Sequence, residues 1–425
     1  MPLIPQLLQA PPSATAYCVA YSGGMDSTVL LHLAHAARLP NLSAIHIHHG
    51  LQASADDWAA QCQARCAVLG VPLQVLRVQV DAQHPQGPEA AAREARYTAL
   101  RAQLPAGAVL LTAHHAGDQA ETILLRLLRG TGVEGLAAMG MTSAFGAHTL
   151  WRPLLRTSRE ALLDYAQQHG LHWSEDPHNR DPRYARSWLR AQVMPALRSR
   201  WPDADAQLAR AADHAADATL LLTNLANTLL LKLQGAEGGL SVAGLIALAP
   251  AERRLVLRHW LQQQGLPPPF AQTLQQLDAD VLPAATTAMP LLRWPGAEFR
   301  RYRGQLFAGR TLQAVPDDLC LDWDGVAPLA LPAGLGELST DTPQPMQVRF
   351  AMPGLRIRLK GAPHSRSLKQ LSQENAVPPW WRSRLPIIFV DRTVVSIAGH
   401  WNTQGAPALS WRTRESWGLP ASWQQ

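Results

Sequence analysis

Apolar positions along the first ~130 residues follow two alternating patterns. Short apolar runs, typical of buried strands, lie at 16–21, 44–48, 73–80 and 108–113. Stretches with helical spacing of their apolar positions lie at 26–37, 56–69, 89–104 and 118–129. Repeated strand–helix units predict an α/β fold with a doubly wound parallel sheet. Ligands of such sheets bind at the carboxyl ends of the strands, so the loops that follow the strands are candidate sites.

The pattern changes in the rest of the chain. Helices are predicted at 158–169, with Ser158 as N-cap, at 205–234 and at 251–263, and strands are predicted within 298–306. The segment 315–345 is rich in Pro, Gly and Asp, and 347–410 reads as β-rich with one helix near 367–375. We therefore predict a sheet domain at 1–204, a helical domain at 205–314, a linker region at 315–346 and a small β-rich C-terminal domain at 347–425.

Composition narrows the class of protein. The net charge is +6, and nearly all cationic residues are Arg, which favours a basic surface for nucleic acid. The chain has only 4 Cys in 425 residues and no C-x-x-C pair, so we expect a reducing, cytoplasmic environment. No apolar run reaches the ~18 residues of a membrane span, and the first residues lack the basic region of a signal peptide. We expect no membrane partner.

The most informative segment follows the first predicted strand. Ser22-Gly23-Gly24-Met25-Asp26-Ser27 forms a glycine turn that leads directly into a predicted helix. This arrangement points free backbone N–H groups and a helix N-terminus at an anion, and the glycines leave room for a phosphate. Asp26 would repel a bare phosphate, so its presence indicates a divalent cation that bridges the carboxylate and a nucleotide. No Walker-type phosphate loop occurs in the sequence.

A second group of polar residues follows a later strand. His114 and His115 precede Asp118 and Glu121, which lie three residues apart and so share a face of the first helical turn. Two carboxylates there either hold Mg²⁺ or bind the amine of an incoming nucleophile; helix capping is the simpler alternative.

Arginine is concentrated in two further segments. Arg93 and Arg96 share a helix face, and either side chain could stabilise charge on phosphates. The segment 180–201 interleaves arginines with Trp188 and Trp201, a combination that suits the backbone and unstacked bases of RNA.

Taken together, these motifs resemble the tRNA(Ile)-lysidine synthetase family, whose phosphate loop is that of the N-type ATP pyrophosphatases (PP-loop ATPases). The matching segments, in order along the chain, are Ser22–Ser27, His46–Leu51, Glu89–Tyr97, Thr112–Glu121, Leu124–Gly135, Arg152–Leu155, Glu175–Asn179 and Arg183–Arg190. Near the C-terminus, Arg366–Lys369 and Val377–Arg382 resemble the C-terminal domain of the longer family members, which engages the tRNA acceptor arm. Residues 249–260 resemble the family's helical substrate-binding domain.

The resemblance implies a PP-loop ATPase fold of the adenine nucleotide alpha hydrolase-like type, and it implies a reaction. ATP adenylates C2 of cytidine 34 in a tRNA(Ile) with a CAU anticodon, and free L-lysine then displaces AMP to leave lysidine, which changes codon recognition from AUG to AUA. The implied cofactors are ATP and Mg²⁺, and a homodimer is compatible with the family.

The resemblance also assigns residues to roles. The implied catalytic residues are Asp118, Glu121, Arg93, Arg96 and Arg186. The implied ATP-binding residues are Ser22, Gly23, Gly24, Met25, Asp26, Ser27, His46, His49 and His115, with Asp26 also as metal ligand. The implied tRNA-binding residues are Arg183, Arg190, Arg366, Lys369, Trp380 and Arg382.

Three alternatives remain at this point. A PP-loop tRNA thiolase would use the same adenylation, but it needs a sulfur carrier, and Cys62 and Cys66 are expected to lie in a helix away from the loops. An amidotransferase would need a glutaminase domain with a nucleophilic Cys, for which the chain has no room. A non-catalytic RNA-binding protein would not need the intact loop together with Asp118 and Glu121.

Overall fold

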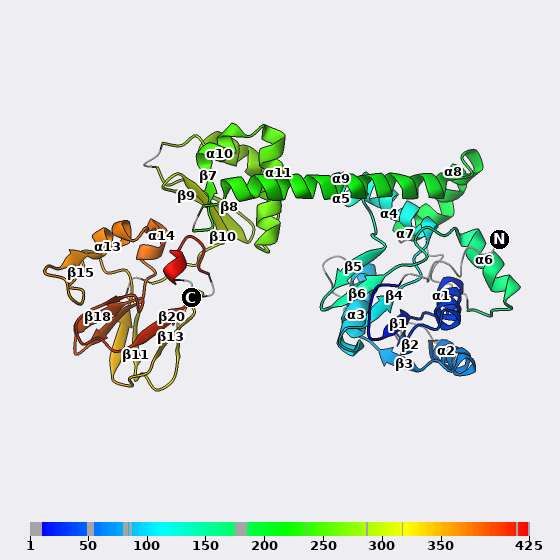
Figure 1. The fold of residues 1–425 in the computed structure, drawn as a ribbon, viewed down its shortest axis with the longest axis horizontal. Helices are drawn as coiled ribbons and strands as arrows, with labels where there is room; N and C mark the ends of the chain where they lie inside the picture. Colours follow the sequence, from blue (N-terminus) through cyan, green and yellow to red (C-terminus); the bar gives the residue numbers. More distant parts are fainter. Residues whose placement is uncertain are drawn as a thin grey trace. The chain divides into compact units, whose positions relative to one another are not determined.

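The computed structural model describes residues 11–48, 55–79, 84, 87–174, 185–235, 237–285, 288–316, 318–413 and 415–423. Contacts divide the chain into two compact units, Met1–Leu221 and Leu222–Gln425. Figure 1 shows both, with helix α9 (Ala204–Leu233) running from the end of the first into the second. Among the described residues, no helix is both long enough and apolar enough to span a membrane.

The first unit contains the predicted parallel sheet. Its strands are β1 (Tyr17–Ala20), β2 (Leu42–His48), β3 (Leu73–Arg77), β4 (Val109–Leu111), β5 (Thr142–Phe145) and β6 (His148–Trp151). They lie in the order β3-β2-β1-β4-β6-β5, and all neighbours are parallel except the β5–β6 hairpin. Because the chain crosses from one side of β1 to the other, the strand order reverses between β1 and β4, where ligands of doubly wound sheets bind. The predicted α/β fold class is confirmed.

Helices cover both faces of this sheet. They are α1 (Met25–Ala36), α2 (Ala55–Leu69), α3 (Pro88–Gln103), α4 (Ala116–Leu128), α5 (Val133–Leu136) and α6 (Arg159–Gln168), followed by α7 (Ala185–Trp188), a π-helical turn (Leu189–Val193) and α8 (Met194–Arg200). Side chains of β1 alternate between two cores: Val19 packs with α1, α2 and α6, and Cys18 packs with α3. Ser158 caps α6 as predicted, accepting a hydrogen bond from the Ala161 N–H at 3.2 Å.

The second unit begins with a small mixed region. It contains β7 (Leu240–Ser241), α10 (Val242–Ala247), α11 (Pro250–Gln263), α12 (Ala271–Gln276), a π-helical turn (Leu277–Val281), β8 (Leu291–Trp294), β9 (Ala297–Tyr302) and β10 (Gln305–Arg310). The four strands form an antiparallel sheet in the order β7-β10-β9-β8. The predicted helices near 205–234 and 251–263 and the predicted strands near 298–306 are confirmed.

The C-terminal region is β-rich, as predicted. Its strands are β11 (Cys320–Trp323), β12 (Leu329–Ala330), β13 (Glu337–Thr340), β14 (Met346–Arg349), β15 (Arg356–Ile357), β16 (Arg366–Ser367), β17 (Ile387–Val390), β18 (Thr393–Ile397), β19 (Trp401–Asn402) and β20 (Leu409–Arg412). Its helices are α13 (Leu368–Glu374), α14 (Pro379–Arg382) and a 3₁₀ turn (Ala421–Trp423).

The predicted linker at 315–346 is wrong. Strand β11 pairs with β14, and β13 pairs with β20, so both are built into the C-terminal sheets. Trp323, Leu335 and Leu338 are buried in the same core as Val348 and Ile388. Pro and Gly in this segment lie in the turns between short strands. Because both residues are common in tight turns as well as in linkers, their abundance does not distinguish the two. The C-terminal β-rich region therefore begins before β11 and not at residue 347.

Candidate functional site

The predicted phosphate loop joins β1 to α1 at the reversal point of the sheet. Gly24 is the N-cap of the 12-residue helix α1 and provides no side-chain cap, which leaves the N-terminal amides to a ligand. Gly23 has φ 81°, in the left-handed region that glycine tolerates best. A Cβ at Gly23 would lie 2.7 Å from Cys62 Sγ, so the loop is also packed tightly on α2.

Hydrogen bonds hold this loop in shape. Within it, the hydroxyl oxygens of Ser22 and Ser27 lie 3.0 Å apart. From outside, the carbonyl of Gly23 accepts hydrogen bonds from the Ser174 N–H at 3.0 Å and from the Arg65 guanidinium at 3.2 Å. Sequence reasoning missed Arg65 and Ser174 as supports of the loop. The only available signal was the position of Ser174 just before the Glu175–Asn179 motif, which itself lies outside the described residues.

Asp26 lies in the first turn of α1, where a bound phosphate chain would meet the loop. Its Oδ1 is buried and has no hydrogen-bond partner among the described residues, whereas its Oδ2 lies 3.8 Å from His115 Nε2. Burial raises the pKa of Asp26, because the site offers the carboxylate little of the solvation that it loses. An orphaned carboxylate oxygen fits a hard divalent cation such as Mg²⁺, which takes one or two protein ligands and completes its shell with phosphate and water. No group of three His, Cys, Asp or Glu that could hold a metal occurs in the described part of the chain.

His115 links this loop to the helix that follows β4. It is the N-cap of α4, and its Nδ1 accepts a hydrogen bond from the Gly117 N–H at 3.0 Å. In the neutral ring the proton is therefore on Nε2, which faces Asp26 Oδ2 at 3.8 Å and Asp118 Oδ2 at 3.6 Å. His115 thus lies between Asp26 and Asp118, and its place beside the phosphate loop is compatible with the ATP-binding role that the resemblance implies.

The other predicted ATP-binding histidines differ in their surroundings. His46 is buried on β2, and its Nδ1 donates to the Tyr21 carbonyl at 2.9 Å, immediately before the loop. Burial lowers the pKa of His46, so the ring is neutral and supports the loop backbone. His49 lies outside the described residues.

The acidic pair on α4 binds two arginines. Glu121 is 2% exposed; its Oε2 accepts from Arg186 Nε at 2.8 Å and its Oε1 from Arg190 Nε at 2.6 Å. Asp118 Oδ1 accepts from both guanidinium groups, at 3.0 Å from Arg186 and 3.1 Å from Arg190. The arginines lie four residues apart on α7 and the π-helical turn, so one helix face meets another through complementary charges.

Among the four carboxylate oxygens of Asp118 and Glu121, Asp118 Oδ2 accepts no hydrogen bond from an arginine of the described residues. Asp118 Oδ2 accepts the backbone N–H of His115 at 3.1 Å and otherwise faces the His115 ring. Burial by itself raises the pKa of Asp118, but the charges of His115 and Arg186 outweigh it and the net shift is downward. Asp118 is therefore a stable anion, and its Oδ2 lies beside the same His115 Nε2 that faces Asp26.

The two arginines of the predicted pair, Arg93 and Arg96, differ in their exposure to solvent. Both guanidinium groups lie over the Tyr97 ring, at 5.0 Å and 5.2 Å from its centroid, but Arg93 is exposed and Arg96 is half-buried. Burial lowers the pKa of His114 to about 3, and the nearby arginine charges, that of Arg96 among them, act in the same direction. Of the two, Arg96 is thus the one whose charge reaches the His114–Arg186 region.

The predicted tRNA-binding residues fall into different environments. Arg190 is held in the acidic cluster, and Arg366 pairs with Glu374 at 2.7 Å. Lys369 is exposed and Arg382 is half-buried. Arg183 lies outside the described residues.

Trp380 corrects one of these predictions. It is 8% exposed and packs against Tyr302, Phe307 and Trp417, with Arg300 over its ring at 5.5 Å. A tryptophan that fills a core has no free face for a nucleotide base. The tRNA-binding role of Trp380 came from the family resemblance, and the local sequence does not show that Tyr302, Phe307 and Trp417 cover the ring.

Comparison with known proteins covers nearly the whole chain. Family models match residues 4–197 (PP-loop domain), 240–307 (TilS substrate binding domain) and 346–417 (TilS substrate C-terminal domain). The tRNA(Ile)-lysidine synthase of Xanthomonas axonopodis pv. citri is 44% identical over 425 residues, which cover 96% of each protein. That of Alkalilimnicola ehrlichii is 44% identical over 403 residues, covering 91% of this chain and 89% of the other.

A solved structure is also similar, at a lower level. The U34-tRNA thiolase NcsA from Methanococcus maripaludis is 16% identical and has a TM-score of 0.41, with 50% of this chain and 76% of that chain covered. This value is too low to support any argument about function. The full-length relatives are decisive, and by their identity and coverage the chain belongs to the tRNA(Ile)-lysidine synthase family.

Proposed function

We propose that the chain ligates L-lysine to C2 of cytidine 34 in the CAU anticodon of tRNA(Ile), with cleavage of ATP to AMP and pyrophosphate. The product, lysidine, changes codon recognition from AUG to AUA. ATP binding and tRNA modification follow from membership of the family. The nucleotide position, the carbon atom and the amine are the finer parts of the proposal.

The observation that carries the proposal is the phosphate loop with Asp26 in it. The loop occupies the point where the strand order reverses, and the N-terminus of α1 opens there without a side-chain cap. The buried, unpartnered Oδ1 of Asp26 is costly in an empty site and is satisfied by a cation that also binds phosphate. Mg²⁺, when bound, would reduce the negative charge of the triphosphate.

We assign the acidic pair two different tasks. Glu121 holds Arg186 and Arg190 through contacts of 2.6–2.8 Å, so that two guanidinium groups stay near the loop and stabilise charge on the phosphates as pyrophosphate leaves. Asp118 uses its remaining oxygen, Oδ2, to attract the ammonium group of lysine toward the site. His115 Nδ1 already accepts from the Gly117 N–H, and its Nε2 lies between the two acids, so we assign the proton that lysine must lose to a carboxylate or to water.

A thiolase is the main competing enzyme, and the structure changes one argument about it. Cys62 was expected to lie away from the loops, but it packs directly beneath Gly23. Burial raises the pKa of its thiol to about 12, so it remains protonated and is a poor sulfur nucleophile at neutral pH. The proximity of Cys62 to the loop therefore reflects packing and gives no support to thiolation.

The test is the dependence of pyrophosphate release on substrates. Adenylation releases one pyrophosphate per tRNA before lysine reacts, so we expect release over many turnovers only when lysine and tRNA(Ile) with a CAU anticodon are both present with ATP and Mg²⁺. We expect labelled lysine to be incorporated at cytidine 34. Release that needs a sulfur donor would establish the thiolase. RNA binding without any ATP turnover would establish a non-catalytic protein.

A further inference from the structure

The peptide bond between Gly23 and Gly24 is fixed from outside the phosphate loop. Its carbonyl oxygen, on Gly23, accepts the Ser174 N–H at 3.0 Å and Arg65 Nη1 at 3.2 Å. A carbonyl oxygen has two lone pairs, so these two donors satisfy it fully. One donor lies on α2 and the other follows α6, and both are distant from the loop in sequence. The direction of this carbonyl is therefore set by the tertiary structure.

The guanidinium group of Arg65 is itself oriented by two side chains. Its Nη2 donates to Gln61 Oε1 at 3.1 Å and to Ser174 Oγ at 3.3 Å, and the Ser174 hydroxyl donates to Gln61 Oε1 at 2.8 Å. Gln61 lies one helical turn before Arg65 on α2. Arg65 is half-buried, and these acceptors are all neutral, so its hydrogen bond to the Gly23 carbonyl is charge-assisted.

The N–H of the same peptide bond faces the inside of the loop. A trans peptide is planar, and its C=O and N–H point in opposite directions; the described residues contain no cis peptide bond. The Gly24 N–H therefore points away from Arg65 and toward Ser22, whose Oγ lies 3.4 Å from the Gly24 nitrogen. This distance is long for a hydrogen bond, so the N–H can donate to a stronger acceptor. The Ser27 hydroxyl lies 3.0 Å from that of Ser22, on the same side.

The local backbone does little to keep this peptide bond in one orientation. Glycines flank it on both sides, and glycine adopts a wide range of backbone angles. A rotation of the peptide plane would need changes only in ψ of Gly23 and φ of Gly24. It would turn the negative end of the carbonyl toward a bound phosphate and would break both hydrogen bonds to Gly23. The contacts of Arg65 and Ser174 thus disfavour the orientation that cannot bind an anion.

We infer that Arg65 is a positioning residue for ATP: through the Gly23 carbonyl, it holds the Gly24 N–H in the direction from which it donates to the phosphates. The inference rests on the proposed use of this loop for ATP. Arg65 contacts no phosphate in this role, and Gln61 acts only by orienting Arg65.

The experiment is calorimetric titration of the full chain with MgATP, without lysine or tRNA. Arg65→Met keeps the apolar stem and removes the donors, and we expect affinity to fall about tenfold, because the Gly24 N–H loses much of its hydrogen bond to a charged group. Gln61→Ala keeps the net charge and should weaken binding about threefold, because the guanidinium loses one acceptor that orients it. The double variant should bind no more weakly than Arg65→Met, since Gln61 acts through Arg65.

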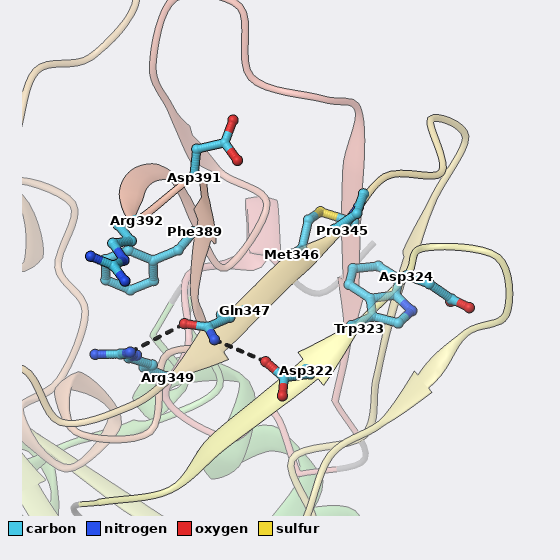
Figure 2. A pocket seen from close by; sticks show the side chains of 10 residues that line it. All are labelled: Asp322, Trp323, Asp324, Pro345, Met346, Gln347, Arg349, Phe389, Asp391 and Arg392. Atoms are coloured by element: carbon cyan, nitrogen blue, oxygen red, sulfur yellow. Dashed lines mark hydrogen bonds between the residues drawn. The ribbon is translucent and has the colours of Figure 1, made fainter.

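The matched control is Arg349→Met. Figure 2 shows Arg349 in a hollow of about 1030 Å³ on β11, β14 and β17, where its Nη2 donates to Gln347 Oε1 at 3.1 Å. The contact between Arg65 and Gln61 has the same length. Arg349 belongs to the other compact unit, so its removal changes the net charge equally without removing a donor to the Gly23 carbonyl. We expect its MgATP affinity to equal that of the unmodified chain.

Turnover distinguishes positioning from a general structural role. Arg65→Met should raise KM for ATP and leave KM for lysine unchanged, whereas a damaged fold would raise both. The inference is overturned by unchanged affinity in Arg65→Met, by an equal loss in Arg349→Met, by additive losses in the double variant, or by parallel rises in both KM values. If Arg65→Met fails to fold, Gln61, which is exposed, still provides the test, and unchanged affinity in Gln61→Ala then overturns the inference. An unmodified chain that binds no MgATP would instead reject the proposed function itself.

Discussion

Substitution of Glu121 by Gln tests the arrangement on which the proposed chemistry depends. The carboxylate is 2% exposed and accepts three arginine N–H contacts, two through Oε2 and one through Oε1. Removing one partner of a buried ion pair typically costs about 3–5 kcal/mol. Gln keeps the shape and one acceptor, and the arginine side chains are 26% and 43% exposed, so water compensates in part. We therefore expect a loss of about 2–3 kcal/mol in the docking of α7 and the π-helical turn onto α4.

Hydrogen exchange of the full, ligand-free chain measures this local loss. At 1.4 kcal/mol per factor of ten, protection of the amides in Ala185–Val193 should fall about 30- to 140-fold, while the core of β1 keeps its protection. The control is Glu134→Gln on α5, an exposed glutamate without an ion pair among the described residues. Equal protection in Glu121→Gln and the unmodified chain, or an equal fall in the control, would refute the reasoning.

The same variant separates the roles of the two acids in the reaction. If Glu121 acts by holding Arg186 and Arg190, Glu121→Gln should slow the formation of adenylated tRNA itself. If Asp118 attracts the lysine ammonium, Asp118→Asn should instead allow adenylated tRNA to accumulate when lysine is at ordinary concentration. Full activity in both variants would contradict every role assigned to the pair. Accumulation of the intermediate in Glu121→Gln as well would assign both acids to lysine.

Three further predictions follow from individual residues. Asp26→Asn should abolish ATP turnover, yet it should stabilise the ligand-free chain against urea at neutral pH. The raised pKa of the Asp26 carboxyl means that folding becomes less favourable as pH rises through that pKa, and Asn removes this cost. Lower stability of the variant would contradict this. His114→Asn should make the free energy of unfolding less sensitive to acid between about pH 6.5 and 3. A histidine with a lowered pKa stabilises the fold above its unfolded pKa and loses that contribution as pH falls. Unchanged pH dependence would argue against a buried neutral ring. Gly23→Ala should lower the free energy of unfolding by about 2–4 kcal/mol, because the new Cβ meets Cys62 Sγ at 2.7 Å in a left-handed backbone. The control in the same denaturation assay is Gly24→Ala, whose Cβ meets no atom closer than 3.5 Å.

Much of the first unit was determined by the sequence alone. Apolar strands that alternate with amphipathic helices predict a parallel sheet, because the helix between two strands returns the chain to the same edge and covers the apolar face of the sheet. Phosphate-loop chemistry is equally local: Ser22–Ser27 lie in one turn, so their composition and their place before a helix contain the necessary signal. The pairing of Asp118 and Glu121 on one face follows from helix geometry in the same way.

Other features depended on contacts between residues distant in sequence. The linker prediction failed because short strands such as β11 are stabilised by partners more than 20 residues away, Cys320 by Arg349 for example, and their own sequence resembles turns. Trp380 is buried because the β9–β10 hairpin and Trp417 pack on it. Arg186 and Arg190 meet the acids of α4 across 65 residues or more, and no local pattern specifies that partner. The tertiary structure decided these points because burial and charge pairing are properties of surfaces that the chain brings together only when it folds.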